Sequence, residues 1–286
     1  MEKKRIVYIG LAVLCIGIFI GSFFIKGSPR RHLTIVHVND THSHFEPVRS
    51  GSRAGLGGII ERAAFVDSVR AADGAENVLL LHAGDFSQGT TYFSELGGDL
   101  EIEELNNMGY DVVTLGNHEF DNGLEDLGRR LSSLNMPVVC CNYDFSPFEA
   151  GKYIKPCTVI EKAGIRIGVV GVLCNLKAMV SAEISNRIPE FETLPTVQKY
   201  VDKLRNEDGC EFVIALTHIG YEKENPEDFV DPDLVAGTRG IDLVVGGHSH
   251  TFLTEKKIHR NLDGKKVPVV QDGCWGLYVG KLDVVF

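Results

Sequence analysis

The stretch Asp111–Gly123 reads DVVTLGNHEFDNG and joins an apolar run to a turn of polar side chains. The run Asp111–Leu115 is apolar and rich in β-branched residues, as expected of a buried strand. The turn then places an amide at Asn117, an imidazole at His118 and a carboxylate at Asp121. An amide oxygen can bind a metal ion, an imidazole can point to a substrate, and a carboxylate can hold that ring in place. The stretch therefore predicts a strand that ends in a reaction centre.

Four further apolar runs also end in residues that commonly bind metal ions. They are Leu33–Val38 followed by Asp40 and His42, Val78–Leu81 followed by Asp85, Glu211–Leu216 followed by His218, and Ile241–Val245 followed by His248 and His250. Each motif alone is weak, because a surface turn, a helix cap or a core histidine explains it equally well. The ordered set predicts a metal centre, because hard divalent ions need carboxylates, amides and imidazoles that converge from rigid supports.

The rest of the chain alternates between strand and helix patterns in the same way. Further strand signals cover Val138–Cys141, Ile165–Val172, Val267–Val270 and the final Leu282–Phe286. Helical patterns cover Ile59–Val69, the stripe Leu124, Leu127, Leu131 and Leu134, and the stripe Val197, Val201 and Leu204 after Pro195. Strands that alternate with helices predict an α/β architecture with apolar central sheets.

Composition narrows the class of protein. A chain of 286 residues with 44% hydrophobic and 24% charged residues suits one substantial α/β domain. The net charge of -10 gives no support for binding a nucleic-acid polymer, which usually requires a basic face. The seven cysteines contain no Cys-x-x-Cys pair, so a zinc–thiolate site is not expected. One or two disulfide bonds can form if the domain is exported. Cys140 and Cys141 are expected on opposite faces of a strand and therefore not bonded to each other.

The N-terminus is expected to lie outside the folded domain. Residues 1–5 are basic, and the 20 residues of Ile6–Ile25 carry no charge, which suits a membrane span better than the shorter core of a signal peptide. This favours an uncleaved transmembrane anchor, with a cleaved signal as the alternative. Residues 26–32 then form a linker, and residues 33–286 form a catalytic domain on the exported, periplasmic or extracytoplasmic side.

The motifs resemble those of the calcineurin-like metallophosphoesterase superfamily, and the wording around them is closest to the 5'-nucleotidase branch. The segments that carry the resemblance are Val38–His42, Ala83–Asp85, Asn106–Asp111 and Thr114–Gly123. The resemblance implies a four-layer αββα sandwich of the metallophosphoesterase type. It also implies two divalent ions, Mn, Zn, Fe or Co, that would share Asp85 as a bridging ligand.

The resemblance also assigns ligands and catalytic roles. One ion would be held by Asp40, His42, Asp85 and His250, and the other by Asp85, Asn117, His218 and His248. His118, oriented by Asp121, would stabilise the transition state without binding a metal. At His250 some 5'-nucleotidases have glutamine, so metal preference can differ. In that branch a second, C-terminal domain recognises the nucleotide, and this chain is expected to lack that domain. A separate polypeptide that carries it is therefore a hypothesis.

The expected function is that of a metal-dependent phosphoric ester hydrolase. The substrate would be a nucleoside 5'-monophosphate, cleaved by in-line attack of a metal-bridging hydroxide. The same chemistry on 2',3'-cyclic nucleotides, nucleotide-sugar pyrophosphates or a sulfur ester is the alternative. A rival of another class is a membrane-anchored binding subunit whose site is vestigial.

Overall fold

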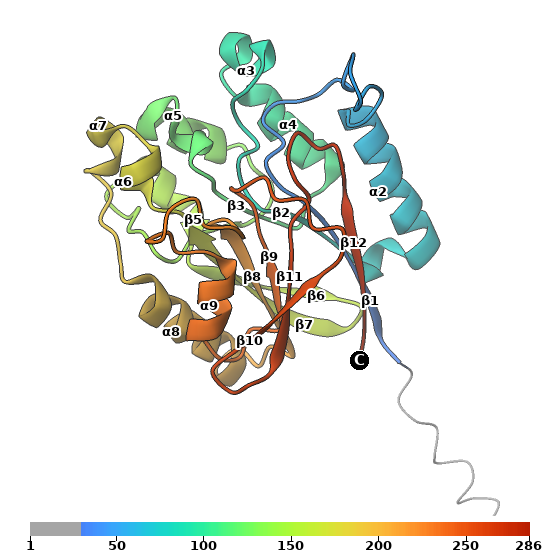
Figure 1. Cartoon of the computed structure of the whole chain (residues 1–286), viewed down its shortest axis with the longest axis vertical. Coiled ribbons are helices and arrows are strands. Elements are labelled where there is room, and N and C mark those ends of the chain that lie inside the picture. The colour runs from blue at the N-terminus through green and yellow to red at the C-terminus, as the bar shows by residue number, and fades with distance from the viewer. Residues whose placement is uncertain (1–29) are drawn as a thin grey trace, which may run out of the picture. The chain divides into compact units, whose positions relative to one another are not determined.

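Two six-stranded β-sheets form the centre of the structure, a computed structural model that describes residues 30–286 (Figure 1). The first sheet contains, in spatial order, β12 (Gly280–Val285), β1 (His32–Val38), β2 (Val78–His82), β3 (Val112–Thr114), β4 (Val138–Val139) and β5 (Ile154–Lys155). The second contains β10 (Lys257–Arg260), β11 (Lys266–Val270), β9 (Leu243–Val245), β8 (Phe212–His218), β7 (Ile165–Leu173) and β6 (Cys157–Lys162).

Parallel pairing brings the carboxyl ends of the central strands to one edge of each sheet. Strands β1 to β5 pair in parallel, as do β7, β8, β9 and β11. In the second sheet, the outer strands β6 and β10 pair antiparallel with β7 and β11. Strands covered on both faces must be apolar along their whole length, which explains the continuous apolar runs in the sequence.

Helices cover the sheets on both sides. They are α2 (Ile59–Asp73), α3 (Thr91–Leu96), α4 (Asp99–Met108), α5 (Gly123–Leu131), α6 (Leu176–Met179), α7 (Ala182–Ser185), α8 (Thr193–Asn206) and α9 (Asp231–Gly237), with single 3₁₀ turns η1 (Ala75–Asn77), η2 (His118–Phe120) and η3 (Glu149–Lys152). Helix α2 packs on β2, α8 packs on β7 and β8, and the two sheets contact each other through β3, β4, β7 and β8 (Figure 1). The α/β class and the two-sheet arrangement are thus confirmed.

Several predicted boundaries are wrong by a few residues. Strand β1 begins at His32, inside the predicted linker, and α5 ends at Leu131 instead of reaching Leu134. Strand β4 stops at Val139, so Cys140 and Cys141 are not on a strand. The reason is that the Cys141 N–H bonds to the carbonyl of Gly171 in the second sheet, which takes the backbone out of the first. All six cysteines among the described residues are free thiols.

The sequence patterns did not predict helices in which polar residues predominate. Helix α4 is the clearest case, because it turns two glutamates, Glu101 and Glu104, toward the interior. Glu104 is compensated by an ion pair with Arg62, which is itself 2% exposed. The two glutamates interrupt the buried apolar stripe of Ile102, Leu105 and Met108 and so weaken the pattern that identifies a helix in sequence.

The proposed anchor, residues 6–25, lies outside the described residues. Within residues 30–286, no helix combines the length and the apolar character needed to cross a membrane.

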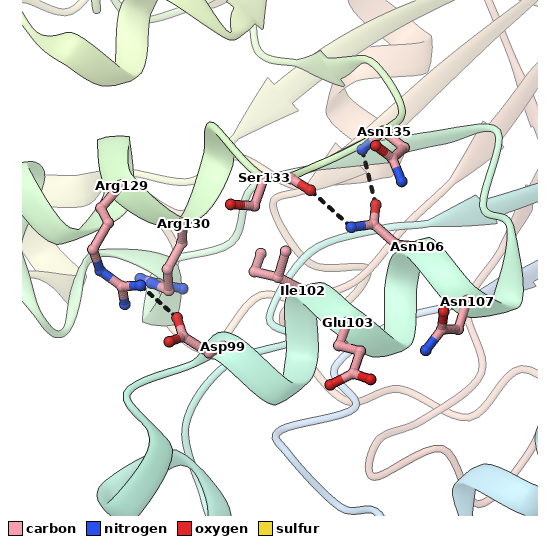
Figure 2. Close-up of a pocket in the computed structure, with 9 residues that line it drawn as sticks. All are labelled: Asp99, Ile102, Glu103, Asn106, Asn107, Arg129, Arg130, Ser133 and Asn135. Carbon is pink, nitrogen blue, oxygen red and sulfur yellow. Dashed lines mark hydrogen bonds and ion pairs between the residues drawn. The ribbon is translucent and has the colours of Figure 1, made fainter.

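A cavity of about 390 Å³ between α4 and α5 is built from helix-to-helix contacts (Figure 2). Arg129 of α5 pairs with Asp99 of α4. Asn106 donates to the carbonyl of Ser133 and accepts from the N–H of Asn135. These polar groups bind one another, so we assign the cavity a structural role.

Candidate metal centre

The predicted ligands meet where the carboxyl ends of both sheets come together. Asp40 and His42 follow β1, Asp85 follows β2, and Asn117 and His118 follow β3. His218 is the last residue of β8, and His248 and His250 follow β9. Ligands of open α/β sheets bind at this edge, because the loops there are held by rigid strands.

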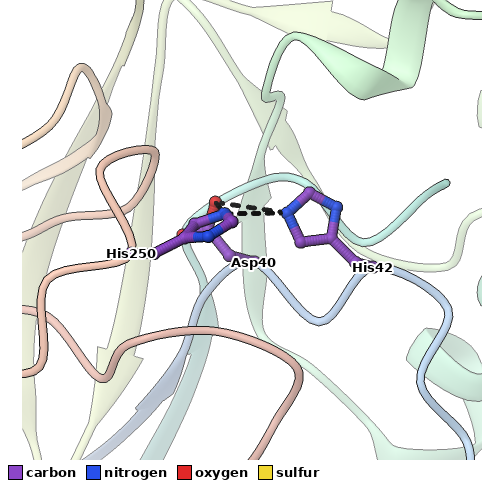
Figure 3. A group of neighbouring side chains, drawn as sticks. All are labelled: Asp40, His42 and His250. Atoms are coloured by element: carbon purple, nitrogen blue, oxygen red, sulfur yellow. Dashed lines mark hydrogen bonds and ion pairs between the residues drawn. The ribbon is translucent and has the colours of Figure 1, made fainter. Parts of the chain in front are cut away.

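The first group of ligands consists of Asp40, His42 and His250, which lie 4.8 Å or less from one another (Figure 3). The Nε2 atoms of His42 and His250 are 3.0 Å apart, and the Asp40 Oδ1 atom lies 3.4 Å from His250 Nε2 and 3.8 Å from His42 Nε2. Two imidazole nitrogens that face each other across a carboxylate suit a shared cation.

The second group consists of Asp85, His218 and His248. The Nε2 atom of His218 lies 3.1 Å from Asp85 Oδ2 and 3.8 Å from Asp40 Oδ1, so this imidazole faces both carboxylates. Asp85 Oδ2 is also 3.8 Å from His42 Nε2. Asp85 therefore lies between the two groups, where a bridging ligand is expected.

Backbone N–H groups hold the two carboxylates in position. The N–H of His118 donates to Asp85 Oδ1 over 2.9 Å, and the N–H of His248 donates to Asp40 Oδ2 over 2.9 Å. Asn39 donates a further hydrogen bond to Asp40 Oδ2. These bonds occupy one side of each carboxylate and leave the other oxygen directed at the imidazoles.

The His118–Asp121 pair lies at the open side of the site. The Nδ1 atom of His118 is 2.9 Å from Asp121 Oδ2, and this hydrogen bond is the main reason that the pKa of His118 is raised. The ligand atoms of His118, His42 and Asp85 also lie within 4.8 Å of one another. Asn117, the remaining predicted ligand, is buried in the same turn, and its Oδ1 atom is 3.8 Å from the Sγ atom of Cys174.

Five of the seven predicted ligands have a backbone conformation that non-glycine residues rarely adopt. The φ angles are 50° at Asp40, 48° at His42, 53° at Asp85, 84° at His248 and 52° at His250. Only nine non-glycine residues in the range 30–286 have positive φ. Such strain costs on the order of 1–3 kcal/mol per residue and clusters at functional sites.

The surroundings of His218 show that the donor set suits a cation. Its Nδ1 atom must donate to the carbonyl of Ala83, 2.7 Å away, so Nε2 carries the lone pair in the neutral ring. That Nε2 atom is fully buried and forms no hydrogen bond. Burial by itself lowers the pKa of His218, but the charges of Asp85 and Asp40 outweigh it and raise that pKa to about 10. The same two carboxylates would favour a divalent ion beside this nitrogen.

The neighbouring groups agree with this reading. Burial opposes ionisation of Asp85, yet the surrounding imidazoles, His218 first, bring its pKa below the ordinary value. Burial and the charge of His218 lower the pKa of His248 to about 4, so that ring is neutral and can bind a metal. Two carboxylates, an amide and four imidazoles form a set that fits divalent ions of the Mn, Fe, Co and Zn kind.

Glu119 is a functional residue whose role the sequence did not reveal. It is fully buried, and its carboxylate accepts hydrogen bonds from the backbone N–H groups of Asp85 (2.9 Å), Ser87 (3.0 Å) and Gly116 (2.6 Å). It therefore ties the turn after β2 to the turn after β3. Its place inside the GNHEFD motif was the available signal.

Gln271, which follows β11, braces the loop that carries His248 and His250. Its Oε1 atom accepts from Ser249 Oγ and the N–H of Thr251, and its Nε2 atom donates to the carbonyl of Gly247. No sequence pattern marks this residue, because a single glutamine after a strand is unremarkable.

The other histidines near the site have partners of their own. His44 bonds through Nδ1 to the carbonyl of His42 and stacks on Trp275, with ring centroids 5.0 Å apart. His82 is fully buried in β2, 3.1 Å from the hydroxyl of Thr41. We assign both to the support of the loop after β1.

The strand ends of two facing sheets bring histidines, carboxylates and an amide together. This arrangement is typical of a metal-dependent ester hydrolase. The family description of the calcineurin-like phosphoesterases matches residues 33–252. The chain belongs to this family, as its motifs predicted.

Known 5'-nucleotidases are similar to this chain. The 5'-nucleotidase of Diplobatis ommata is 36% identical over 276 residues, which are 89% of this chain and 46% of that protein. The probable 5'-nucleotidase of Treponema pallidum is 32% identical over 277 residues, again 89% of this chain and 45% of that protein. The chain thus spans about half the length of the curated relatives that it matches.

Two solved nucleotidase structures are similar in fold to this chain. A 5'-nucleotidase precursor from Thermus thermophilus superposes with a TM-score of 0.79 at 33% identity, covering 89% of this chain and 51% of that one. The NAD nucleotidase of Haemophilus influenzae has a TM-score of 0.78 at 28% identity, covering 90% and 48%. The match is to about half of each structure.

Proposed function

We propose that this chain hydrolyses phosphate esters with two divalent cations, and that nucleoside 5'-monophosphates are its substrates. The observation that carries the proposal is the meeting of the ligands from both sheets around Asp85 and Asp40. The names of the relatives support a nucleotide as substrate. Manganese, zinc, iron and cobalt all suit the donor set.

The residues of the site would have the following roles. Asp40, His42, Asp85 and His250 would hold one ion, and Asp85, Asn117, His218 and His248 the other. Bound cations would lower the pKa of a water molecule and offset the charge of the phosphate. His118, which Asp121 holds through Nδ1, would donate a proton to the oxygen of the departing alcohol.

Substitution of Asp85 by asparagine tests the proposal, because an amide cannot replace a bridging carboxylate. We expect Asp85→Asn to lose most bound metal and nearly all hydrolysis of nucleoside monophosphates. Asp263→Asn is the matched control, since Asp263 pairs with Arg239 on the surface away from the site. Full activity in Asp85→Asn would refute the bridging role.

A panel of substrates separates the alternatives. It would contain a nucleoside 5'-monophosphate, a 2',3'-cyclic nucleotide, a nucleotide sugar and a sulfur ester. Metal analysis together with one generic phosphoester assay tests the rival idea of a binding subunit. An unaltered chain that binds no metal and cleaves none of these compounds would favour that rival.

The membrane location is part of the same proposal and rests on the uncharged stretch Ile6–Ile25. We expect the full chain to remain in the membrane fraction after alkaline extraction, with the catalytic domain exposed on the exported side. Recovery in the soluble fraction would favour a cleaved signal. The separate polypeptide with a nucleotide-recognition domain stays a prediction, to be tested by co-purification from native membranes.

A further inference from the structure

The turn that carries Asp40 and His42 is strained and depends on contacts with other parts of the chain. Asp40, His42 and Ser43 have φ angles of 50°, 48° and 55°, in the left-handed region that non-glycine residues rarely adopt. Such a conformation persists only where the surrounding structure holds it. The N–H groups of these three residues donate to the backbone carbonyls of residues 84–86 over 3.0–3.1 Å. The loop after β2 therefore holds the N–H groups of the turn, and its carbonyl groups need other partners.

Trp275 supports two carbonyl groups of this turn. Its backbone N–H donates to the carbonyl of Asp40 over 2.6 Å. Its ring stacks on His44, with centroids 5.0 Å apart and 18° between the ring planes. Since a carbonyl can only accept, the Nδ1 atom of His44 donates to the carbonyl of His42, 2.8 Å away. Trp275 thus holds the carbonyl of Asp40 directly and that of His42 through His44.

The segment that contains Trp275 also bonds to the loop that carries His250. The N–H of Gly273 donates to the carbonyl of Thr251, the residue after His250, over 3.1 Å. The carbonyl of Gly273 accepts from Asn39, which also donates to Asp40 Oδ2. Residues 273–275 therefore join the two loops that carry the first group of ligands, which Figure 3 shows.

The conformation of Trp275 indicates a role at the site. Its φ angle is 63°, which is unusual for a bulky side chain, and 38% of the residue is exposed. Burial in the core therefore does not explain why a large ring is held in a strained backbone position. Strained positions of this kind cluster at functional sites.

We propose that Trp275 is a positioning residue for the first ion, the one assigned to Asp40, His42, Asp85 and His250. This inference rests on the proposed two-ion site. The left-handed φ angles set the directions in which Asp40 and His42 leave the backbone, so both ligands are in place only while the turn is held. Loss of the ring should weaken the first ion more than the second, because the contacts of Trp275 do not involve Asn117, His218 or His248.

Fluorescence tests the position of Trp275 beside the first ion. Trp275 is the only tryptophan of the sequence, so the emission of tryptophan reports on this position alone. We expect titration of the metal-free chain with Mn²⁺ to change that emission when the first ion binds. His42→Ala should abolish the change and His248→Ala should preserve it. A change that disappears in His248→Ala and persists in His42→Ala would overturn the inference.

Substitution of Trp275 tests its role in holding the turn. Free Mn²⁺, measured by electron paramagnetic resonance, gives the affinity in variants without a tryptophan. We expect Trp275→Ala to weaken one of the two Mn²⁺ ions by about 10–100-fold, as is usual when a residue that orients metal ligands is lost. Trp275→Phe should restore most of the affinity, since a phenyl ring can still stack on His44. Equal weakening of both ions in Trp275→Ala would contradict a role at the first ion.

Tyr278→Ala is the matched control for the loss of an aromatic ring. Tyr278 is 36% exposed, close to the value for Trp275, but its ring stacks on Phe252, with centroids 4.0 Å apart. We expect both Mn²⁺ affinities of Tyr278→Ala to equal those of the unaltered chain. The same loss in Tyr278→Ala as in Trp275→Ala would assign the effect to general destabilisation and overturn the inference.

A double substitution tests whether the ring acts through His44. His44→Ala should weaken the first ion to the same extent as Trp275→Ala. The combination of both substitutions should weaken it no further, because residues that act in one chain of contacts are not additive. Additive losses would show that the ring of Trp275 does not act through His44.

Failure of this inference differs from failure of the proposed function. If the unaltered chain binds two Mn²⁺ ions and cleaves AMP, but Trp275→Ala binds both ions with unchanged affinity, the function stands and the inference is wrong. If the unaltered chain binds Mn²⁺ in a manner that Trp275→Ala weakens, but cleaves no phosphate ester, the proposed function is wrong and the role of Trp275 stands.

Discussion

Replacement of Glu119 by glutamine tests whether one buried carboxylate holds two turns of the site together. In the unaltered protein, Glu119 Oε2 accepts from the N–H groups of Asp85 and Gly116, and Oε1 accepts from that of Ser87. Glutamine keeps the shape but has only one acceptor oxygen. If that oxygen faces Asp85 and Gly116, the new NH₂ group is directed at the N–H of Ser87.

The expected cost follows from these contacts. A hydrogen bond to a charged group contributes about 1.5–3 kcal/mol, and a buried donor left without a partner costs about 1–3 kcal/mol. Part of this loss is offset, because burial and the nearby charge of Asp85 disfavour the ionised Glu119 and raise its pKa. We therefore expect Glu119→Gln to lower the free energy of unfolding by about 2–3 kcal/mol.

Urea unfolding in the presence of a chelator measures this loss without the contribution of metal binding. Glu101→Gln is the matched control, because Glu101 is also fully buried but makes no hydrogen bond to either turn. Metal content measured on the folded proteins should fall in Glu119→Gln and stay constant in Glu101→Gln. A change of less than about 0.5 kcal/mol in Glu119→Gln would refute the reasoning, since it lies within the range of ordinary surface substitutions.

Three further predictions address the chemistry, the stability and the packing of the site. His118→Ala should lower kcat by about 10²–10⁴-fold while metal content stays the same, because the ring serves in proton transfer; simultaneous loss of metal would contradict this role. Burial raises the pKa of Asp231 to about 7, above its unfolded value, so stability should fall as pH rises from about 4 to 7. Asp231→Asn should flatten that decline in chelator-treated protein, and an identical pH profile would refute it. Gly116→Ala should abolish activity, because a Cβ atom there would lie 2.2 Å from Asp85 Oδ1, whereas Gly209→Ala has open space and should cost only about 1–2 kcal/mol for its left-handed backbone. Activity assays and urea unfolding of both variants measure the difference.

The sequence predicted the strands that carry the site better than it predicted the helices around them. Strand β2 is fully buried and apolar from Val78 to Leu81, so its sequence clearly indicates a buried strand. The sequence did not identify helix α4, because Glu101 and Glu104 occupy part of its buried face. A buried Glu104 is tolerated only because Arg62 of α2 forms an ion pair with it. A charge compensated by a residue 42 positions away leaves no local signal.

For the site, the sequence by itself determined which residues carry the chemistry, since each candidate follows an apolar strand. It also determined the class of reaction, because carboxylates, imidazoles and an amide are the ligands of hard divalent ions. Only the tertiary structure decided which of them meet. His42 and His250, 208 positions apart, face each other because the two sheets pack together with the carboxyl ends of β1 and β9 on the same side. The sequence also did not determine the positive φ angles or the hydrogen bonds of Glu119 to the turns after β2 and β3. Both depend on contacts that exist only in the folded structure.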